Sequence, residues 1–291
     1  MMTLDKLSPC KVNLILNILG KRADGFHELE TIMHPVAVCD RLTFQRIAVA
    51  VELTCNNPSL PLDSGNLVVR AAELFRKRTG ISDGVRIHLE KYLPLAAGLG
   101  GGSANAAITL QALNELFGSP LEFDQLHQLA GTLGSDVPFF LQSGPALATG
   151  RGEHVRPLEG FAALHGTAFL LIHPGFGIST AWAYKTLAQY PLALNGTPGR
   201  AEKLVSLLRE RDARAAGAEF YNSLEAPALH KYPLLVLFQE FLREQGAWAT
   251  LMSGSGSTTF AIAESVSKAE SLREGFFGKF GTTHWTAIVP A

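Results

Sequence analysis

A glycine-rich stretch at residues 94–107, PLAAGLGGGSANAA, carries the clearest chemical signal in the sequence. Gly98, the glycines at 100–102 and Ser103 lead directly into a run rich in alanine and leucine, which are strong helix formers. Glycine lets the backbone approach a ligand closely, and the free N–H groups at the start of a helix attract anions. Alternating apolar and polar side chains at 85–90 predict a strand just upstream. Strand, glycine loop and helix together are typical of a phosphate-binding site.

Two well-known phosphate loops fit this stretch poorly. A Walker loop requires a lysine directly before its serine or threonine, and the residue before Ser103 is a glycine. The dinucleotide fingerprint is nearly met by Gly98, Gly100 and Ser103, but it also requires an acidic residue that ends a second strand about twenty positions on. Glu122 lies at about that distance, but it follows a Gly-Ser-Pro turn and begins another helix. A plain glycine connector between a strand and a packed helix is the remaining alternative.

A second group of polar residues lies within the first 30 positions. Residues 7–20 alternate as in a strand, with Lys11 and Asn13 among apolar neighbours. An edge strand whose lysine reaches out to solvent would explain that pattern equally well. The next residues form a polar turn around an Asp-Gly pair and end in Phe26 and His27. Taken singly, Phe26 is typical of a core and His27 of a surface.

Asp136 stands just before Pro138 in the string GSDVPFFL. Because Ser or Asp shortly before a proline is a helix N-cap pattern, capping alone would explain this residue. A carboxylate among strongly apolar neighbours is costly without a partner, however. Burial alone therefore leaves capping and a partnered carboxylate both open for Asp136.

Composition indicates a folded protein and gives no sign of a nucleic-acid or membrane partner. The length of 291 residues suggests two domains, and 47% hydrophobic residues are ample for a buried core. The net charge of −1 gives no electrostatic reason to expect nucleic acid or an anionic membrane surface as a partner. Three widely spaced cysteines predict neither a zinc site nor a disulfide framework. With no apolar leader or membrane-length run, a soluble cytoplasmic protein is expected.

Hydrophobic periodicity predicts helices mixed with short strands, which is typical of an α+β sandwich. In the first half we expect strands at 7–20, twice within 33–56, at 85–89 and at 144–152, and helices at 66–78, 103–117 and 123–133. In the second half we expect strands at 169–173, 247–252, 258–263 and 284–289, helices at 180–187, 201–213, 232–244 and 266–276, and a connector at 191–200.

The glycine stretch matches the pattern Pro-x-x-x-Gly-Leu-Gly-Gly-Gly-Ser-x-x-Asn-Ala over its whole length. It resembles the ATP loop of the galactokinase, homoserine kinase, mevalonate kinase and phosphomevalonate kinase (GHMP) superfamily. The string KVNLILNILGKRADGFHELETIM at 11–33 resembles the N-terminal signature of one family within it, the kinases of a cytidine diphosphate methylerythritol. Phe26 stands where tyrosine is common. Met252–Gly256 resembles the superfamily's third motif, although a hairpin turn would also select those glycines.

The resemblance implies a two-domain GHMP kinase fold. Residues 1–152 would form the N-terminal, ribosomal-protein-S5-domain-2-like ATP-binding domain, and residues 153–291 a C-terminal ferredoxin-like α/β sandwich. The active site is expected in the cleft between them. ATP would be the phosphoryl donor with Mg²⁺, whose protein ligands stay open, with Ser103 as one candidate. Asp136 would be the catalytic base, and Lys11 its electrostatic partner.

The resemblance also assigns binding residues. Phe26 and Tyr184 would stack on the two faces of a pyrimidine, and His27 would hydrogen-bond its edge. By composition alone, Tyr184 would be a core-facing helix residue. Asn66 would be a helix cap, which is compatible with a position near the adenine. The expected ATP-binding residues are Asn66, Leu67, Pro94, Gly98, Leu99, Gly100, Gly101, Gly102, Ser103 and Asn105. The expected substrate-binding residues are Asn13, Phe26, His27, Thr180 and Tyr184.

Two other functions remain open at this point. A homoserine- or mevalonate-type kinase would share the ATP loop but would leave the Arg-x-Asp-Gly-Phe-His element without a role. A non-catalytic nucleotide-binding regulator would be expected to have lost Lys11 or Asp136, and both are present. The expected partner is a small molecule, with neither nucleic acid nor membrane, and the chain is expected to be a monomer or a weak homodimer.

Overall fold

The computed structural model describes residues 3–210 and 212–291, and within them it shows the expected α+β class with two sheets. One seven-stranded sheet contains β1 (Thr3–Lys21), β2 (His27–Ile47), β3 (Val51–Cys55), β4 (Gly84–Glu90), β5 (Ala146–Gly150), β6 (His154–Pro157) and β8 (Tyr221–Asn222). A four-stranded sheet contains β7 (Ala168–His173), β9 (Ala249–Met252), β10 (Thr259–Ala263) and β11 (Trp285–Pro290), in the order β11-β7-β10-β9.

The chain divides into two compact units, and the long strands β1 and β2 contribute residues to both. The first unit comprises Met1–Cys10, Ala37–Leu93 and Gly100–Ser143. The second comprises Lys11–Val36, Pro94–Leu99 and Gly144–Ala291. The domain boundary after residue 152 stays a prediction, because a grouping by packing does not test where one family domain ends.

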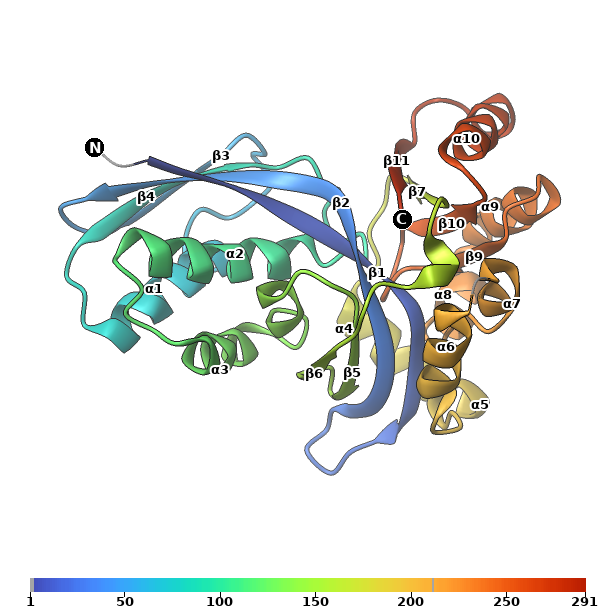
Figure 1. Ribbon diagram of the computed structural model, residues 1–291, viewed down its shortest axis with the longest axis horizontal. Helices are drawn as coiled ribbons and strands as arrows, with labels where there is room; N and C mark the ends of the chain where they lie inside the picture. The colour runs from blue at the N-terminus through green and yellow to red at the C-terminus, as the bar shows by residue number, and fades with distance from the viewer. Residues whose placement is uncertain (1–2, 211) are drawn as a thin grey trace. The chain divides into compact units, whose positions relative to one another are not determined.

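In the first unit, helices cover a sheet whose strands follow the predicted alternation. Val85, Ile87 and Leu89 of β4 are buried, while their neighbours on the strand point away. β4 pairs antiparallel with β2 and parallel with β3. Figure 1 shows helices gathered on one face of this part of the sheet. They are α1 (Leu67–Thr79), α2 (Gly101–Leu116) and α3 (Phe123–Leu133), followed by the 3-10 turn η1 (Pro138–Leu141).

Caps fix the ends of these helices where the sequence indicated them. The Asn66 side chain accepts a hydrogen bond from Val68 N at the start of α1, and Gly80 ends that helix with a φ of 73°. Glu122 and Gln125 form a capping box at the start of α3. Glu122 therefore has a local role as a helix cap.

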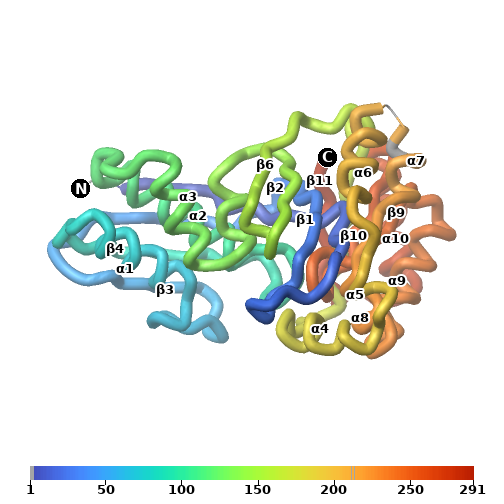
Figure 2. The backbone as a smooth tube through the Cα atoms, turned by 90° about the horizontal axis from the view of Figure 1, so that it is seen from below, coloured from blue at the N-terminus to red at the C-terminus, as the bar shows by residue number. Residues whose placement is uncertain are grey.

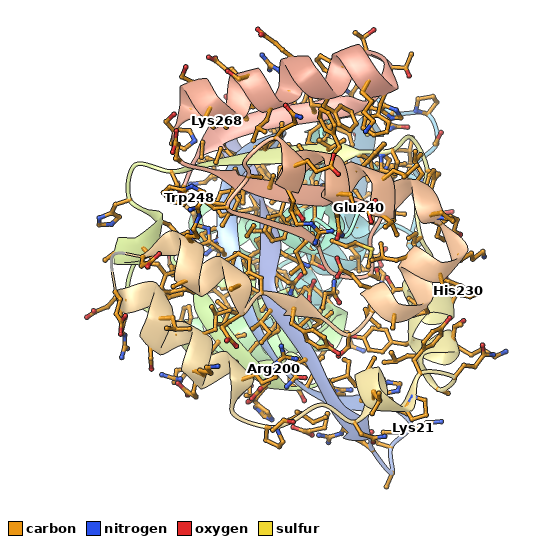
Figure 3. All side chains as sticks on the ribbon, turned by 90° about the vertical axis from the view of Figure 1, so that its right-hand side faces the viewer. Lys21, Arg200, His230, Glu240, Trp248 and Lys268 are labelled. Atoms are coloured by element: carbon orange, nitrogen blue, oxygen red, sulfur yellow. The ribbon has the colours of Figure 1, made fainter. Side chains whose placement is uncertain are left out.

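In the second unit, α9 (Pro233–Glu244) and α10 (Val266–Phe280) pack on one face of the four-stranded sheet. Leu170 and Ile172 of β7 meet Phe238 of α9 and Phe276 of α10 in one buried cluster. The rings of Phe238 and Phe276 lie edge to face, with centroids 4.7 Å apart. Figure 3 shows the two helices, marked by Glu240 on α9 and Lys268 on α10.

A second cluster of the same unit joins the inner parts of β1 and β2 to α4 (Thr180–Leu187), α5 (Pro191–Leu194) and α8 (Glu225–Lys231). Figure 2 shows α4 next to α8, and α4 also contacts α5. Leu16, Leu29, Ala183 and Ala228 are buried in this cluster, which fixes α4 against the strands that carry Lys11 and His27. The remaining elements are α6 (Arg200–Arg209), α7 (Ala213–Ala218) and the 3-10 turn η2 (Ala162–Leu164).

The structure differs from the sequence expectations at several short elements. The helix predicted at 201–213 is two helices: α6 ends at Arg209, and Asp212 caps the start of α7 by accepting a hydrogen bond from Ala215 N at 2.9 Å. The connector predicted at 191–200 contains α5. β6, β8 and α8 were not predicted; each is at most seven residues long, too short for a periodic pattern to develop.

Candidate active site

The turn between β1 and β2 presents Phe26 and His27 through a set of local hydrogen bonds. Asp24 Oδ1 accepts from Phe26 N at 3.1 Å, and Arg22 N donates to Phe26 O at 2.8 Å. Gly25 adopts a φ of 87°, a conformation that glycine takes without strain. Desolvation acts to raise the pKa of the Asp24 carboxyl, but the Phe26 N–H and the Arg22 guanidinium outweigh it and lower that pKa. The Arg-x-Asp-Gly-aromatic-His spacing thus has a structural reason.

The side chains that this turn presents form an aromatic group. The ring centroids of His27 and Tyr184 are 5.1 Å apart, and the guanidinium of Arg151 lies 4.6 Å from the centroid of the Phe26 ring. Phe26 keeps 51% of its surface exposed, which is unusual for an aromatic side chain fixed by its backbone. Burial and the charge of Lys21 lower the pKa of His27, so its ring is neutral at pH 7 and can both donate and accept.

Thr180 and Tyr184 stand one turn apart on α4, so both side chains lie on the same face of the helix. Ser179 caps this helix by accepting from Trp182 N at 3.3 Å. The Thr180 hydroxyl is 2.8 Å from the Ser255 hydroxyl. The structure therefore groups Tyr184 with His27, and Thr180 with the serine-glycine segment at 253–257.

Lys11 is buried, with 3% of its surface exposed, which excludes the interpretation as a solvent-reaching edge lysine. Its Nζ donates to Asn13 Oδ1 at 2.6 Å and to Gly98 O at 3.0 Å. Asn13 in turn donates to Thr31 Oγ1 at 2.9 Å. Lys11 therefore contacts two other residues expected at the site, Asn13 and Gly98.

Gly98 lies at a point where no side chain fits. Its φ is 76°, and a Cβ added there would lie 2.0 Å from Ser253 O. Ser253 Oγ also donates to Gly98 O at 3.0 Å, and Thr258 N donates to Ala97 O at 3.1 Å. The third motif thus lies against the first half of the glycine loop.

The second half of the glycine loop begins α2. Gly100 is the N-cap, with a φ of 70°, and the helix starts at Gly101, two residues before the predicted start at Ser103. The first intrahelical hydrogen bond runs from Ala104 N to Gly100 O, so the N–H groups of Gly101, Gly102 and Ser103 have no acceptor within the helix and can bind an anion. The first turn of α2 therefore has the donors that a phosphate requires.

Of the remaining expected nucleotide residues, Asn66, Leu67 and Asn105 lie in the first unit, and Pro94 and Leu99 lie in the second. Asn66 caps α1, and its Nδ2 donates to Pro61 O at 2.9 Å, which confirms the capping interpretation. Asn105 is 2% exposed, and its Oδ1 has no hydrogen-bond partner among the residues described. Leu67 lies beside α2, with its Cδ1 3.7 Å from the position of a Cβ at Gly102.

Asp136 precedes η1, whose N-cap position is Val137. Asp136 is therefore one residue before the N-cap position of that turn, and its catalytic role stays a prediction. The residues at 137–141 are buried, and Asp136 itself is half-buried at the edge of this apolar group.

Sequence analysis missed a buried ion pair beside the glycine loop. Lys91 pairs with Asp40, and Asp40 Oδ1 accepts from Tyr92 N and Leu93 N at 2.9 Å each. A Cβ at Gly101 would lie 2.9 Å from Lys91 Nζ. A lysine directly before the glycine loop was visible in the sequence, but its partner lies 51 residues away.

Comparison with known protein families gives two matches. The chain matches the GHMP kinases N terminal domain over residues 66–144 and the GHMP kinases C terminal domain over residues 204–281. A 4-diphosphocytidyl-2-C-methyl-D-erythritol kinase of Synechococcus sp. (strain JA-3-3Ab) is 40% identical over 279 residues, which cover 94% of this chain and 89% of that relative.

The chain belongs to the 4-diphosphocytidyl-2-C-methyl-D-erythritol kinase family.

A second member of this kinase family, from Protochlamydia amoebophila (strain UWE25), is 38% identical over 291 residues, covering 100% of this chain and 95% of that relative. A crystal structure of 4-(cytidine 5'-diphospho)-2C-methyl-D-erythritol kinase matches with a TM-score of 0.81 and 34% identity, covering 99% of this chain and 100% of that one. A homoserine kinase from Cytophaga hutchinsonii matches with a TM-score of 0.75 and 22% identity, covering 99% and 93%, and this likeness shows the fold alone.

These findings confirm the GHMP kinase fold and favour the 4-diphosphocytidyl-2-C-methyl-D-erythritol kinase family over homoserine and mevalonate kinases. Membership of a kinase family implies ATP as the phosphoryl donor. No helix of residues 3–210 or 212–291 combines the length and the apolar character that crossing a membrane requires.

Proposed function

We propose that this protein transfers the γ-phosphate of ATP to the 2-hydroxyl of 4-diphosphocytidyl-2-C-methyl-D-erythritol, giving the 2-phosphate and ADP. The step belongs to the non-mevalonate route to isoprenoid precursors. The observation that carries the proposal is the turn at 22–27, which holds an exposed Phe26 beside the His27–Tyr184 ring pair. This arrangement suits a flat heterocycle attached to the acceptor.

Recognition of the acceptor follows from the chemistry of these rings. Phe26 and Tyr184 would stack on the cytosine, because aromatic rings attract a flat base on either face. The neutral His27 ring would hydrogen-bond the edge of the base, since one of its nitrogens donates and the other accepts. Asn13 and Thr180 would contact the methylerythritol portion.

Phosphoryl transfer needs mainly positioning and charge stabilisation. The N–H groups from Leu99 to Ser103 would hold the triphosphate at the start of α2, with Pro94 shaping the loop. Asn66, Leu67 and Asn105 would complete the nucleotide site. Asp136 would accept the proton of the attacking hydroxyl, and Lys11 would stabilise the charge on the transferred phosphoryl group.

Mg²⁺ would arrive with ATP. This ion usually keeps several waters and is bound by one or two protein ligands together with substrate phosphates. The described residues contain no group of three or more His, Cys, Asp or Glu side chains that could hold a metal by themselves. The Ser103 hydroxyl in the first turn of α2 is a hard oxygen donor of the kind that Mg²⁺ prefers, so we propose it as a ligand. The ion would neutralise charge on the phosphate oxygens.

The proposal includes a cytoplasmic location and a monomer or weak homodimer. Its chemical part is tested by ATP consumption with purified protein and Mg²⁺ against four acceptors: the cytidine diphosphate methylerythritol, methylerythritol phosphate, homoserine and mevalonate. We expect turnover with the cytidylyl compound alone, and a kcat at least about a hundredfold lower for Asp136→Asn. Turnover with homoserine or mevalonate instead would contradict the roles given to Phe26, His27 and Tyr184.

A further inference from the structure

The segment Ser253–Ser257 connects two parts of the proposed site through its three serines. Ser253 Oγ donates to Gly98 O at 3.0 Å in the glycine loop. The Ser255 hydroxyl lies 2.8 Å from that of Thr180 at the start of α4. Ser257 Oγ donates to Phe176 O, just before the same helix. The conformation of this segment therefore affects both the phosphate loop and the acceptor helix.

The buried side chain of Asn222, which is 2% exposed, forms hydrogen bonds with the backbone of this segment. Its Nδ2 donates to Met252 O and to Gly254 O, both at 2.7 Å, so the amide binds one carbonyl just before the segment and one within it. Its Oδ1 accepts from Leu224 N at 2.9 Å, which fixes the orientation of the amide. Glu225 Oε1 accepts from Met252 N at 2.8 Å and from Gln239 Nε2 at 2.6 Å.

The backbone that Asn222 holds lies against the groups proposed to act on the phosphate. A Cβ added at Gly254 would lie 2.9 Å from Gly98 O and 3.1 Å from Lys11 Nζ. Asn222 itself belongs to β8, which pairs with β1 at Leu16, so it is anchored on the strand that carries Lys11. A small displacement of Gly254 would therefore move the lysine amine or the Gly98 carbonyl.

We propose that Asn222 is a positioning residue for phosphoryl transfer, acting through Gly254 on Lys11 and through Ser253 on Gly98. This inference rests on the proposed kinase function. An asparagine is required because an aspartate would place a carboxylate against two carbonyl oxygens and supply no donor to either. The role differs from a purely structural one, because the backbone that Asn222 holds contacts the phosphate loop and the amine of Lys11.

The test compares Asn222→Asp with Asn114→Ala. Asn114 is also buried, and its amide exchanges two hydrogen bonds of 2.9 Å with Leu121 in the first unit, so its loss costs comparable stability. In Asn222→Asp we expect kcat to fall by about 10- to 100-fold and the Kd for ADP to rise several-fold, with little change in the acceptor KM. In Asn114→Ala we expect kcat and the ADP Kd to stay within about twofold of the parent protein while Tm falls.

A folded Asn222→Asp protein whose kcat and ADP Kd both lie within twofold of the parent values would overturn the inference. The ADP Kd separates this outcome from failure of the proposed function, because its measurement needs no acceptor. A parent protein that phosphorylates none of the acceptors would contradict the proposed function and leave the inference about nucleotide binding standing.

If Asn222→Asp does not fold, the inference is tested with Ser253→Ala, Asn222→Ala and their double variant. We expect the two losses of nucleotide affinity to be less than additive, since both act on Gly98. Full additivity would contradict the coupling.

Discussion

Single residues give the site its selectivity, and Phe26 shows how. Its ring is exposed although its backbone is fixed by Asp24 and Arg22, so the surface it presents is available before any ligand binds. A preformed aromatic face binds a base without the entropic cost of ordering a flexible loop. The hydroxyl that tyrosine would add is not needed for stacking.

We therefore predict that Phe26→Tyr leaves the acceptor KM within about threefold, whereas Phe26→Ala raises it by about 10- to 100-fold with kcat largely retained, because stacking on a base contributes about 1–3 kcal/mol. Steady-state kinetics with varied acceptor measures this. Phe123→Ala is the matched control, since Phe123 is likewise exposed, at 56%, and has no proposed role. An equal KM for Phe26→Ala and the parent protein would remove Phe26 from the acceptor site.

At the scale of elements, the close approach of two backbone segments at Gly98 shapes the site. The strand-to-helix connection must take a left-handed conformation there, and the segment after β9 lies directly against it. A side chain at Gly98 would collide with Ser253 O, so the glycine is needed for the close approach as well as for its φ.

Two glycine substitutions separate the need for a positive φ from the need for a close approach of the two segments. Gly98→Ala should lower Tm and weaken ADP binding at least about tenfold, because the Cβ forces the two segments apart. Gly118→Ala has a similar φ of 82° and nothing within 4 Å of the added Cβ, so it should cost only about 1 kcal/mol of stability and leave ADP binding unchanged. Thermal unfolding and calorimetric titration with ADP supply both values. Equal ADP affinities for the two variants would show that the contact with Ser253 does not shape the nucleotide site.

At the scale of the whole molecule, the free energy of unfolding depends on pH through histidines that are neutral in the folded state. Burial lowers the pKa of His34 to about 4, and its ring packs against Phe161 and Phe169 with centroids 6.1 and 5.3 Å away. The unfolded chain takes up this proton near pH 6.5 and the folded chain only near pH 4. Stability therefore falls as the pH drops through this window and rises as the pH returns to neutral.

We predict that His34 removes at most about 3 kcal/mol of unfolding free energy between pH 6.5 and pH 4, and less in proportion to the solvent access of its ring. Urea unfolding at pH 7.5, 5.5 and 4.5 measures the slope, with His34→Gln as the variant that cannot take up the proton. The difference between the two proteins should grow as the pH falls. An unchanged difference across the three pH values would show that folding does not lower the pKa of His34.

Local features of the fold could be predicted from the sequence, and contacts between distant segments could not. The glycine loop, α1 with its Asn66 cap and α3 depend on neighbouring residues, and the structure has them within two residues of the predicted positions. The burial of Lys11 and the Lys91–Asp40 pair depend on segments that meet only in the folded chain. Asn222 was overlooked for the same reason: its two acceptors are 30 and 32 residues away, on a strand and a turn that give it no local pattern.

The most direct test of the central claim is a ³¹P NMR spectrum of the product formed from ATP, Mg²⁺ and 4-diphosphocytidyl-2-C-methyl-D-erythritol. The account predicts one new phosphomonoester signal without proton coupling, because C2 of the methylerythritol carries a methyl group and no hydrogen. The diphosphate signals of the cytidylyl group should be retained, and one ADP should form for each product molecule. Formation of ADP and inorganic phosphate without a new ester, or an ester at another hydroxyl, would contradict the account.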